Sequence, residues 1–406
     1  MLLRSAGLFY AVHLLCRELG YRNVSTDVEP DLDTMIKKTT PTQKKATVIG
    51  MKAGGFYNEN SAPQGATIAY VYPWLHEAVA GLDVPVSTSA LRFVDFGCSE
   101  GANSIQIMNQ LVGAAHKHSK RSVEAIHCDL PSNNYTTLLH VIGNREQSPY
   151  TDPSVFGGIV AGSIYNQLLP TNSVHVATSF NTVGFFSELP IDRLPGCILP
   201  NGPSGQATRS TIAAHEKKIF EEQAQRDLKN FLEVRANELV TGGKLLLQQF
   251  ARNDQVSTAD GTIDALDNAL RDHVETREVS QDAYERYIHP VYLRNLDELM
   301  EPVKPDSGVL SNLFTLDKTE CYEVPIPFVE QFKQDYDAAA YAKQLVNFFR
   351  AFSETALQHA LVDTPNTASL LDSIYTRAED LIREAPHLYQ FHFISVAMLL
   401  TRTERN

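Results

Sequence analysis

The sequence predicts an α/β protein with a largely parallel sheet, followed by a mainly helical part. Apolar runs at residues 91–96 and 123–128, and others within 157–170 and 173–190, each end in small or polar residues, as strands that carry functional loops do. After residue 252 the apolar residues recur at helical spacing instead. The chain of 406 residues is long enough for one large domain with an insertion, or for two domains.

The segment at 91–104, LRFVDFGCSEGANS, is the stretch around which the chain is organised. Its apolar run ends in Asp95 and leads into two glycines, Gly97 and Gly101, which let the backbone turn sharply and approach a ligand. Residues 105–111 continue at helical spacing. A strand, a glycine turn and a helix in this order are typical of nucleotide-binding sites, whereas an acid after a strand is also common as a simple helix cap.

The second strand, 123–128, ends in another acid, Asp129. In a doubly wound sheet an acid at this place can accept both ribose hydroxyls of an adenosine. Asp129 lies 129 − 95 = 34 residues beyond Asp95, farther than the roughly 20-residue gap of dinucleotide-binding proteins, and the G-x-G-x-x-G pattern is absent. The sequence therefore argues against a nicotinamide enzyme.

The first fifty residues are expected to be an N-terminal extension and linker. Residues 2–16 are rather apolar and have arginines around them, as a targeting segment can, but the run is too short to span a bilayer and has no clear cleavage site. We favour an extra helix or a disordered arm over a signal or transit peptide. Residues 51–79 then offer a turn at Gly54 and Gly55 and a helix over 66–79, which could be either a lid over a ligand or a surface loop and a packing helix.

The remaining chain predicts one long helix, two further strands and a group of shorter helices. The long helix covers 212–239 and is expected to end at Gly242 and Gly243, before a strand at 244–250. His175 falls within the fourth strand, where we expect a core histidine without a chemical role. The shorter helices and the last strand are expected at 263–271, 282–287, 296–300, 341–352, 369–383 and 391–400.

Composition excludes several classes of function. Acidic residues outnumber basic ones, 48 to 35, and aromatic residues are not interleaved with basic runs, so DNA or RNA is not an expected partner. No further stretch has the composition of a membrane span. The five cysteines are an odd number without a C-x-x-C pair, which argues against a disulfide framework and a zinc site and favours a reducing compartment.

Five stretches in fixed order resemble the SABATH family of plant-type carboxyl methyltransferases, which make methyl esters of salicylate, jasmonate and related acids or N-methylate xanthines. The family's MKGG and SYxxNSxxQ, DLGCSxGPNS, NDLPxNDFN and GSFYxRLFP motifs have counterparts here. A fifth counterpart runs from the fourth strand to a following proline. The resemblance covers residues 51–300 well and fades toward the C-terminus. The matching stretches are 51–64, 95–104, 128–135, 162–170 and 173–190.

The resemblance implies a Rossmann-like class I methyltransferase sheet with an α-helical cap. The implied domains are the extension 1–50, a domain that binds S-adenosylmethionine from 51–250 with a strand near 388–402, and a mainly helical substrate cap at 251–387. The enzyme would be a cytoplasmic homodimer of secondary metabolism, with no nucleic-acid or membrane partner. Its implied cofactor residues are Tyr57, Asn60, Asp95, Gly97, Cys98, Asn103, Asp129, Leu130, Ser163 and Ile164.

The implied reaction needs no general base, because an ionised carboxylate is already a nucleophile at neutral pH. Gln64 would tether one carboxylate oxygen. Salicylate-type relatives use a tryptophan N–H for the other oxygen, but this chain has Phe185, which cannot donate. We hypothesise that Asn181 supplies the missing donor and that the small Gly184 enlarges the pocket. Gln64, Asn181 and Phe185 are thus the candidate catalytic residues, and with Gly184 they form the candidate substrate site.

Two alternatives stay open at this point. Methyl transfer to a phenol or ring nitrogen would need a deprotonating partner, for which His76, His175 or His289 is available only if the fold brings it to the pocket. A silent protein that binds S-adenosylmethionine is the other alternative, suggested by the altered segment 52–56 and by Phe185. Magnesium-binding relatives carry a DxFN stretch before Pro-x-Tyr, and the residues before Pro290 depart from it, so no metal is expected.

Overall fold

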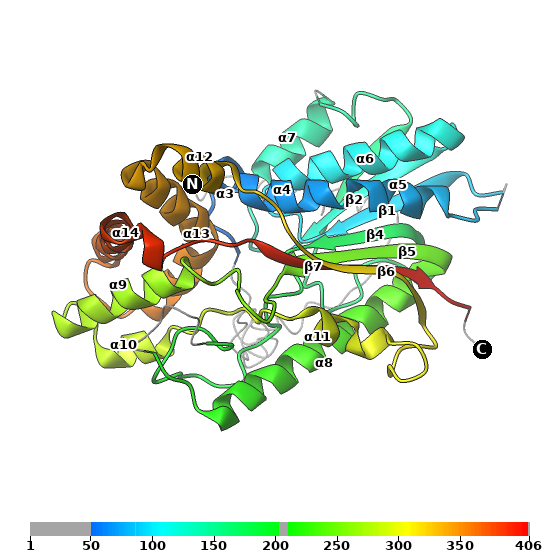
Figure 1. Ribbon diagram of the computed structural model, residues 1–406. Coiled ribbons are helices and arrows are strands. Elements are labelled where there is room, and N and C mark those ends of the chain that lie inside the picture. The colour runs from blue at the N-terminus through cyan, green and yellow to red at the C-terminus, as the bar shows by residue number, and fades with distance from the viewer. Residues whose placement is uncertain (1–49, 86, 146, 203–209, 405–406) are drawn as a thin grey trace, which may run out of the picture. The chain divides into compact units, whose positions relative to one another are not determined.

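The computed structural model describes residues 50–404 except Val86, Glu146 and 203–209. The predicted extension 1–50 therefore lies outside the described residues apart from Gly50. A seven-stranded sheet runs through the described part in the order β3-β2-β1-β4-β5-β7-β6 (Figure 1). The strands are β1 (Ala90–Phe96), β2 (Ser122–Asp129), β3 (Val155–Ala161), β4 (Val174–Phe180), β5 (Leu239–Phe250), β6 (Phe314–Glu323) and β7 (Ile394–Arg402).

The first five strands are parallel, and β7 runs antiparallel between β5 and β6. The side chains of β1 enter two hydrophobic cores, one on each face of the sheet. Phe93 packs into one core and Val94 and Phe96 into the other, and all three are fully buried. Burial on both faces explains why these strands read as nearly continuous apolar runs. The carboxyl ends of β1 to β5 meet at one edge of the sheet, where parallel α/β sheets bind their ligands.

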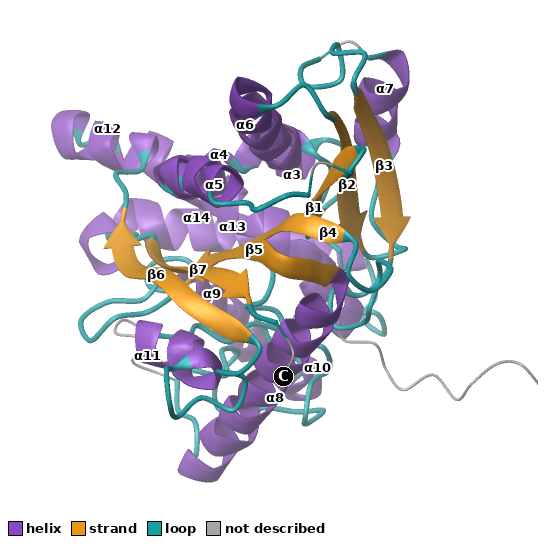
Figure 2. Cartoon of the chain, turned by 90° about the vertical axis from the view of Figure 1, so that its right-hand side faces the viewer, coloured by secondary structure: helices purple, strands orange, loops and turns teal. Residues whose placement is uncertain are grey.

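Helices cover both faces and one end of the sheet (Figures 1 and 2). One face carries α4 (Ala62–Tyr70), α5 (Tyr72–Ala80), α6 (Ala102–His118) and α7 (Thr136–Asn144), and the other carries α8 (Ala214–Glu238) and α11 (Leu296–Met300). The cap at the end consists of α9 (Ile263–Glu275), α10 (Gln281–Arg286), α12 (Pro327–Asp335), α13 (Ala338–Ala360) and α14 (Thr367–Glu384). The short helix α3 (Phe56–Asn60) packs against α13, and 3₁₀ turns occupy Glu301–Val303 and Pro386–Leu388.

Proline breaks the helix that the sequence predicts over 66–79. The chain forms α4 and α5 instead, with Val71 between them and Pro73 in the first turn of α5. Proline has no backbone N–H, so it suits a first turn and interrupts a continuing helix. The predicted helix end at Gly242 and Gly243 is also wrong. Helix α8 ends at Glu238, and Gly242, with φ +77°, lies inside β5 beside an irregularity in its pairing with β4.

Strand β6 is one of the elements that the sequence analysis did not place. It lies inside the range 251–387 that was predicted to be mainly helical, and it pairs with β7 at the edge of the sheet. Its exposed residues, among them Asp317 and Thr319, alternate with partly buried ones that include Lys318 and Glu320, so charged and polar side chains occupy both faces, as is common on edge strands. That alternation makes its apolar signal weak. The last strand begins at Ile394, three residues later than predicted.

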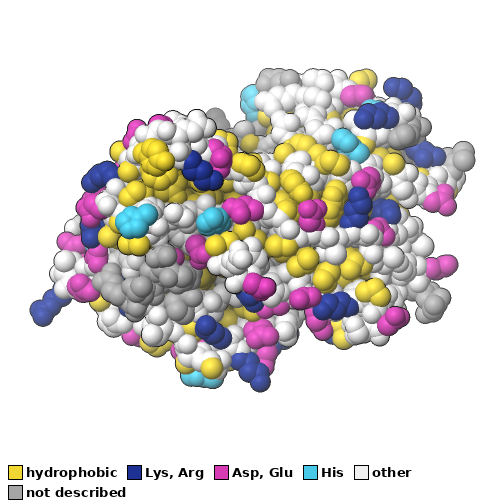
Figure 3. Space-filling model, viewed as in Figure 1, with side chains coloured by type: hydrophobic (Ala, Val, Ile, Leu, Met, Phe, Trp, Pro, Cys, Tyr) yellow, Lys and Arg dark blue, Asp and Glu magenta, His cyan; other side chains and the backbone are white. Residues whose placement is uncertain are grey.

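The surface carries both signs of charge. On the face shown in Figure 3, basic and acidic side chains of the described residues are interspersed, and hydrophobic side chains lie between them. Among the described residues, no helix is both long and apolar enough to cross a bilayer.

Candidate active site

Three adjoining cavities lie at the carboxyl ends of the parallel strands, and Tyr57 and Asn181 line all three. Two of them surround the turn after β1 and together are called the glycine-turn cleft; they reach from Asp95 to Ser163. The third, called the aromatic pocket, lies between β5, the segment around Met51 and Tyr57, and the cap helices α9 and α13. The two sites therefore meet at Tyr57 and Asn181.

The turn after β1 can be built only from glycine at two positions. Gly97 and Gly101 have φ of +99° and +106°, which side chains other than hydrogen rarely allow. A Cβ atom at Gly97 would lie 1.9 Å from the Thr182 Oγ1, and one at Gly101 would lie 2.9 Å from the Leu138 Cδ1. The Thr182 and Leu138 side chains therefore fill the space that larger residues would need at these two positions, and Gly97 lines the cleft.

Asp129, at the end of β2, is bound to the glycine turn. Its Oδ2 accepts the Ser99 N–H at 2.6 Å and its Oδ1 accepts the Leu130 N–H at 2.7 Å. Burial raises the pKa of Asp129, and these two amides oppose the rise. Each carboxylate oxygen keeps a second lone pair for a ligand. The Ser99 hydroxyl also lines the cleft and has no partner among the described residues.

Asp95 lies deeper in the cleft and accepts two side-chain hydrogen bonds, from the Thr178 hydroxyl at 2.7 Å and the Ser104 hydroxyl at 2.5 Å. Burial raises the pKa of Asp95 to about 6. The Ser104 hydroxyl also lies 2.7 Å from the His127 Nδ1, which continues the network away from the cleft. A buried carboxylate of this kind is stabilised by a cationic group, such as an ammonium, placed against it.

A buried ion pair on α8 holds the loop that carries Ser163 and Ile164. Arg235 donates to the carbonyls of Ile164 and Asn166, both at 2.8 Å, and its guanidinium lies over the Phe96 ring. Glu238 pairs with Arg235 at 2.8 Å and accepts the amides of two further loop residues, 168 and 169. Sequence reasoning missed this pair, because an arginine and a glutamate three apart on a helix usually form a surface contact.

The segment 52–58, called the lid segment, contains Tyr57 and is anchored both to the glycine turn and to α13. The buried Glu100 accepts the N–H groups of Gly55 at 2.9 Å and Asn58 at 3.4 Å. On the other side, Lys52 pairs with Glu354 of α13 at 2.8 Å. These contacts hold Tyr57 where it lines all three cavities, and both alternatives, a lid and a packed surface loop, stay open.

Nine of the ten predicted cofactor residues line the glycine-turn cleft, and Asn60 does not. Its Nδ2 donates to the Phe56 carbonyl at 2.8 Å within α3. Asn58 lines the cleft instead, and its Oδ1 accepts the Ala102 N–H at 3.3 Å. The nine that line the cleft are Tyr57, Asp95, Gly97, Cys98, Asn103, Asp129, Leu130, Ser163 and Ile164.

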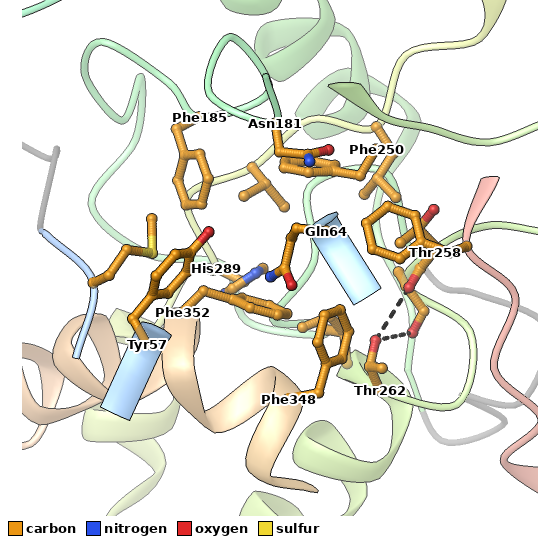
Figure 4. Close-up of a pocket in the computed structure, with 16 residues that line it drawn as sticks. Tyr57, Gln64, Asn181, Phe185, Phe250, Thr258, Thr262, His289, Phe348 and Phe352 are labelled. Carbon is orange, nitrogen blue, oxygen red and sulfur yellow. Dashed lines mark hydrogen bonds between the residues drawn. The ribbon is translucent and has the colours of Figure 1, made fainter. Parts of the chain in front are cut away.

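The aromatic pocket has an apolar wall (Figure 4). Its free space is about 540 Å³, part of it open to solvent. The hydroxyls of Thr258 and Thr262 are bonded to backbone carbonyls at 2.8 Å and 3.0 Å, so the pocket's free polar groups come from other residues. The apolar wall consists of Phe185, Phe250, Phe348, Phe352, Phe393, Ile263, Val291, Leu293, Ala259 and Met51.

Asn181 presents an unpaired amide donor to this pocket. Its φ is +54°, and its N–H donates to the Gln248 carbonyl at 2.8 Å. The Gln248 Nε2 donates in turn to the Asn181 Oδ1 at 3.3 Å. The Asn181 Nδ2 is therefore left buried with no partner among the described residues. The buried Gln64 of α4 lines the same pocket, and no described residue bonds to its Oε1 (Figure 4).

Gly184 does not line any of the three cavities, so the prediction that it enlarges the pocket is corrected. A Cβ atom there would lie 2.3 Å from the Phe250 Cζ, which shows that the ring of Phe250 fills the space. Phe250 then packs edge-on against Phe185, with ring centroids 5.8 Å apart, and both rings line the pocket. Sequence reasoning could not predict this contact, because Phe250 follows 250 − 184 = 66 residues later.

Of the three candidate bases, the structure brings only His289 into the aromatic pocket. His76 lies 2.9 Å from the Gln110 side chain, and the His175 Nδ1 accepts the Arg92 N–H at 3.0 Å. Burial lowers the pKa of His289 to about 3, so its ring is neutral and weakly basic at neutral pH.

The chain matches the family described as SAM dependent carboxyl methyltransferase over residues 47–403. Gibberellic acid methyltransferase 2 of Arabidopsis thaliana is 22% identical over 342 residues, which cover 78% of this chain and 86% of that protein. Farnesoic acid carboxyl-O-methyltransferase of the same plant is 28% identical over 270 residues, 64% and 75% of the two chains. S-adenosyl-L-methionine:benzoic acid/salicylic acid carboxyl methyltransferase 2 of Petunia hybrida is 24% identical over 361 residues, which cover 85% of this chain and 95% of that protein.

The solved structure of a loganic acid methyltransferase with SAH has the same fold, with a TM-score of 0.71. It is 21% identical and covers 87% of this chain and 99% of its own. The glycine-turn cleft fits S-adenosylmethionine, since it is lined by Gly97, by Ser99 with an unpaired hydroxyl and by the carboxylates of Asp95 and Asp129. The chain belongs to the SABATH family of S-adenosylmethionine-dependent carboxyl methyltransferases, and it methylates small organic acids.

Proposed function

We propose that this enzyme esterifies an acid with an apolar body and that Gln64 and Asn181 hold its carboxylate. The observation that carries the proposal is the unpaired Asn181 Nδ2, which lies in the aromatic pocket together with the Gln64 amide. A buried donor without a partner is costly, and a carboxylate oxygen satisfies it. Asn181 thus replaces the tryptophan donor of salicylate-type relatives.

The residues of the site position reactants rather than transfer protons. S-Adenosylmethionine supplies a methyl group on a sulfonium, and the acid is already ionised at neutral pH. The two amides would direct one carboxylate oxygen toward the glycine-turn cleft. Phe185, which lines both the cleft and the pocket, would pack on the acid and exclude water. Alignment and desolvation of this kind are worth up to about 7–11 kcal/mol of the barrier.

In the cleft, we assign the ribose hydroxyls to Asp129 and the ammonium group to Asp95. Leu130 and Ile164 would flank the adenine as apolar walls. The position of Asn58 on the cleft supports giving it the role first assigned to Asn60.

The pocket lining supports a monocarboxylic acid. Its wall is aromatic, and none of the described lining residues is a lysine or arginine, so a second carboxylate would be buried without a countercharge. The names of the relatives include gibberellic, farnesoic and salicylic acids, which have largely apolar bodies. We propose that the substrate of this chain is of that kind.

We further propose a cytoplasmic homodimer that acts in secondary metabolism. Family membership supports the dimer and the metabolic role, and the free cysteines at 98, 128, 197 and 321 are consistent with a reducing compartment. Sedimentation of the purified protein and fractionation of cells test these assignments.

The experiment that tests the reaction uses a labelled methyl donor and a panel of aromatic, indolic, fatty and dicarboxylic acids. Esters lose the label in base, whereas phenol ethers and N-methyl rings keep it. A base-labile product supports carboxyl transfer, and a base-stable product would favour the phenol or ring-nitrogen alternative. Binding of the donor without any transfer would indicate a silent binding protein.

A further inference from the structure

His289 is the polar side chain of the aromatic pocket that carboxylate binding leaves unused. It is 1% exposed and lies on the pocket wall (Figure 4). Its backbone is fixed by the His289 N–H, which donates to the Ile198 carbonyl at 2.7 Å. Its ring lies 5.9 Å from the ring of Phe352, so the surroundings of the imidazole are aromatic.

Only one ring nitrogen of His289 has a partner among the described residues. The Nδ1 lies 3.2 Å from the Tyr287 hydroxyl, which is itself buried and outside the pocket lining. No described residue bonds to the Nε2 of this pocket-lining ring, and the Nε2 does not belong to the buried atoms that lack a partner, as the Asn181 Nδ2 does. Both threonines of the pocket satisfy their hydroxyls on the backbone, so His289 differs from them in this respect.

We infer that the acid carries an oxygen substituent, a hydroxyl or a carbonyl, on its apolar body, and that this oxygen bonds to the His289 Nε2. The inference rests on the proposed function, because it assumes that the carboxylate lies at Gln64 and Asn181. His289 is then a specificity-determining residue, separate from the carboxylate site.

The chemistry of the imidazole selects among substituents. If Tyr287 donates to Nδ1, the Nε2 carries the proton and bonds to either a carbonyl or a hydroxyl; with the other tautomer it accepts only from a hydroxyl. A second carboxylate would find no countercharge here, because burial lowers the pKa of His289 to about 3 and keeps the ring neutral. A plain hydrocarbon body would leave the Nε2 unpaired in the complex.

The test compares matched acids in the full-length enzyme. Each of three scaffolds, phenylpropanoic, decanoic and cyclohexanecarboxylic acid, is assayed as the parent, as its positional hydroxy derivatives and as an oxo derivative. We expect kcat/KM for the best oxygenated acid to exceed that for its parent by about 10- to 100-fold. A parent acid that reacts as well as all of its oxygenated derivatives on every scaffold would overturn the inference.

Variants assign the preference to the residue. His289→Leu is expected to remove it by lowering kcat/KM for the oxygenated acid alone, and His289→Gln, which can still hydrogen-bond, to retain part of it. Tyr287→Phe leaves the pocket lining intact. It is expected to weaken the preference, because the Nδ1 loses its partner and the proton is no longer held on one ring nitrogen. Phe352→Leu is the matched control, since it changes the same wall without a polar group and should affect both acids alike.

The outcomes separate the two proposals. If no acid is methylated, the proposed function fails and the inference falls with it. If acids are methylated but His289→Leu keeps the full preference for oxygenated ones, only the inference fails. Thermal unfolding and SAH binding of each variant show whether it folds. If His289→Leu does not fold, the kinetics of His289→Gln test the inference.

Discussion

The Gln248 Nε2 donates a hydrogen bond to the Asn181 Oδ1 at 3.3 Å, whereas the Nδ2 of Asn181, a residue that lines the aromatic pocket, has no partner among the described residues. Gln248 is fully buried on β5 and also donates to the Ser395 hydroxyl at 3.0 Å. The donor at the pocket therefore depends on a side chain that does not itself line it. The proposed function rests on this relationship, because it leaves an unpaired donor at Asn181 in a chain that has Phe185 in place of tryptophan.

Replacing Asn181 should lower catalysis without affecting the cofactor site. Asn181→Ala is expected to reduce kcat/KM about 10- to 100-fold, because one charge-assisted hydrogen bond is lost. Asn181→Asp should be worse, since it places a negative charge beside the carboxylate. Steady-state kinetics with the best acid measures both, and an active Asn181→Asp enzyme would contradict the proposed orientation of the amide.

Removing the buried arginine of α8 should loosen the cofactor loop. Arg235→Leu leaves Glu238 without its countercharge, and breaking a buried pair costs about 3–5 kcal/mol of unfolding free energy. SAH affinity should fall as well, because the carbonyls of Ile164 and Asn166 lose their donor. Calorimetric unfolding and SAH titration measure the two effects. Lys229→Leu, which breaks the exposed pair with Glu233 on the same helix, is the control and should change little.

Cofactor affinity should depend on pH through Asp95. Its pKa is raised to about 6 by burial, so the carboxylate is ionised above that pH and protonated below it. An ammonium group binds the ionised form, so SAH affinity should be full above pH 6 and fall by up to about tenfold per pH unit below it.

The same shift has the opposite sign for the free protein. Because the folded pKa of Asp95 is raised, its contribution to stability is present below the ordinary aspartate pKa of 3.8 and is lost as the pH rises through about 6. The predicted pH dependence of SAH affinity is tested by titration calorimetry of the wild type and Asp95→Asn between pH 5 and 8. A wild-type affinity that stays constant from pH 5 to 7.5 would show that Asp95 does not face the ammonium.

The lid should release SAH faster when its anchor at the glycine turn is removed. Glu100→Ala deletes the acceptor of the Gly55 and Asn58 amides, and we expect the dissociation rate to rise about 5- to 20-fold. Lys52→Met breaks the lid's partly exposed pair with Glu354 and should have the smaller effect. Competition kinetics measures both rates, and equal rates in Glu100→Ala and wild type would show that the lid is not held there.

The sequence predicted the parallel strands and the glycine turn because these depend on local signals. The apolar run before Asp95 and the positive φ of Gly97 are encoded within a few residues. The donor role of Asn181 was predicted because Phe185 cannot donate a hydrogen bond, and the unpaired Asn181 Nδ2 supports that role.

Other features could not be read from the sequence because they depend on distant contacts. Gly184 faces a ring that arrives with β5, Arg235 reaches a loop about 70 residues earlier in the chain, and Asn58 rather than Asn60 faces the cleft because of how α3 packs. Strand β6 was missed since its edge position permits a polar composition.

The most direct test of the central claim is methyl transfer by the Gln64→Ala/Asn181→Ala double variant, with SAH affinity measured in parallel. We predict that the wild type forms a base-labile ester, that the double variant loses at least about 100-fold in kcat/KM, and that its SAH affinity stays within about twofold of wild type. Ester formation at the wild-type rate by the double variant would contradict the account.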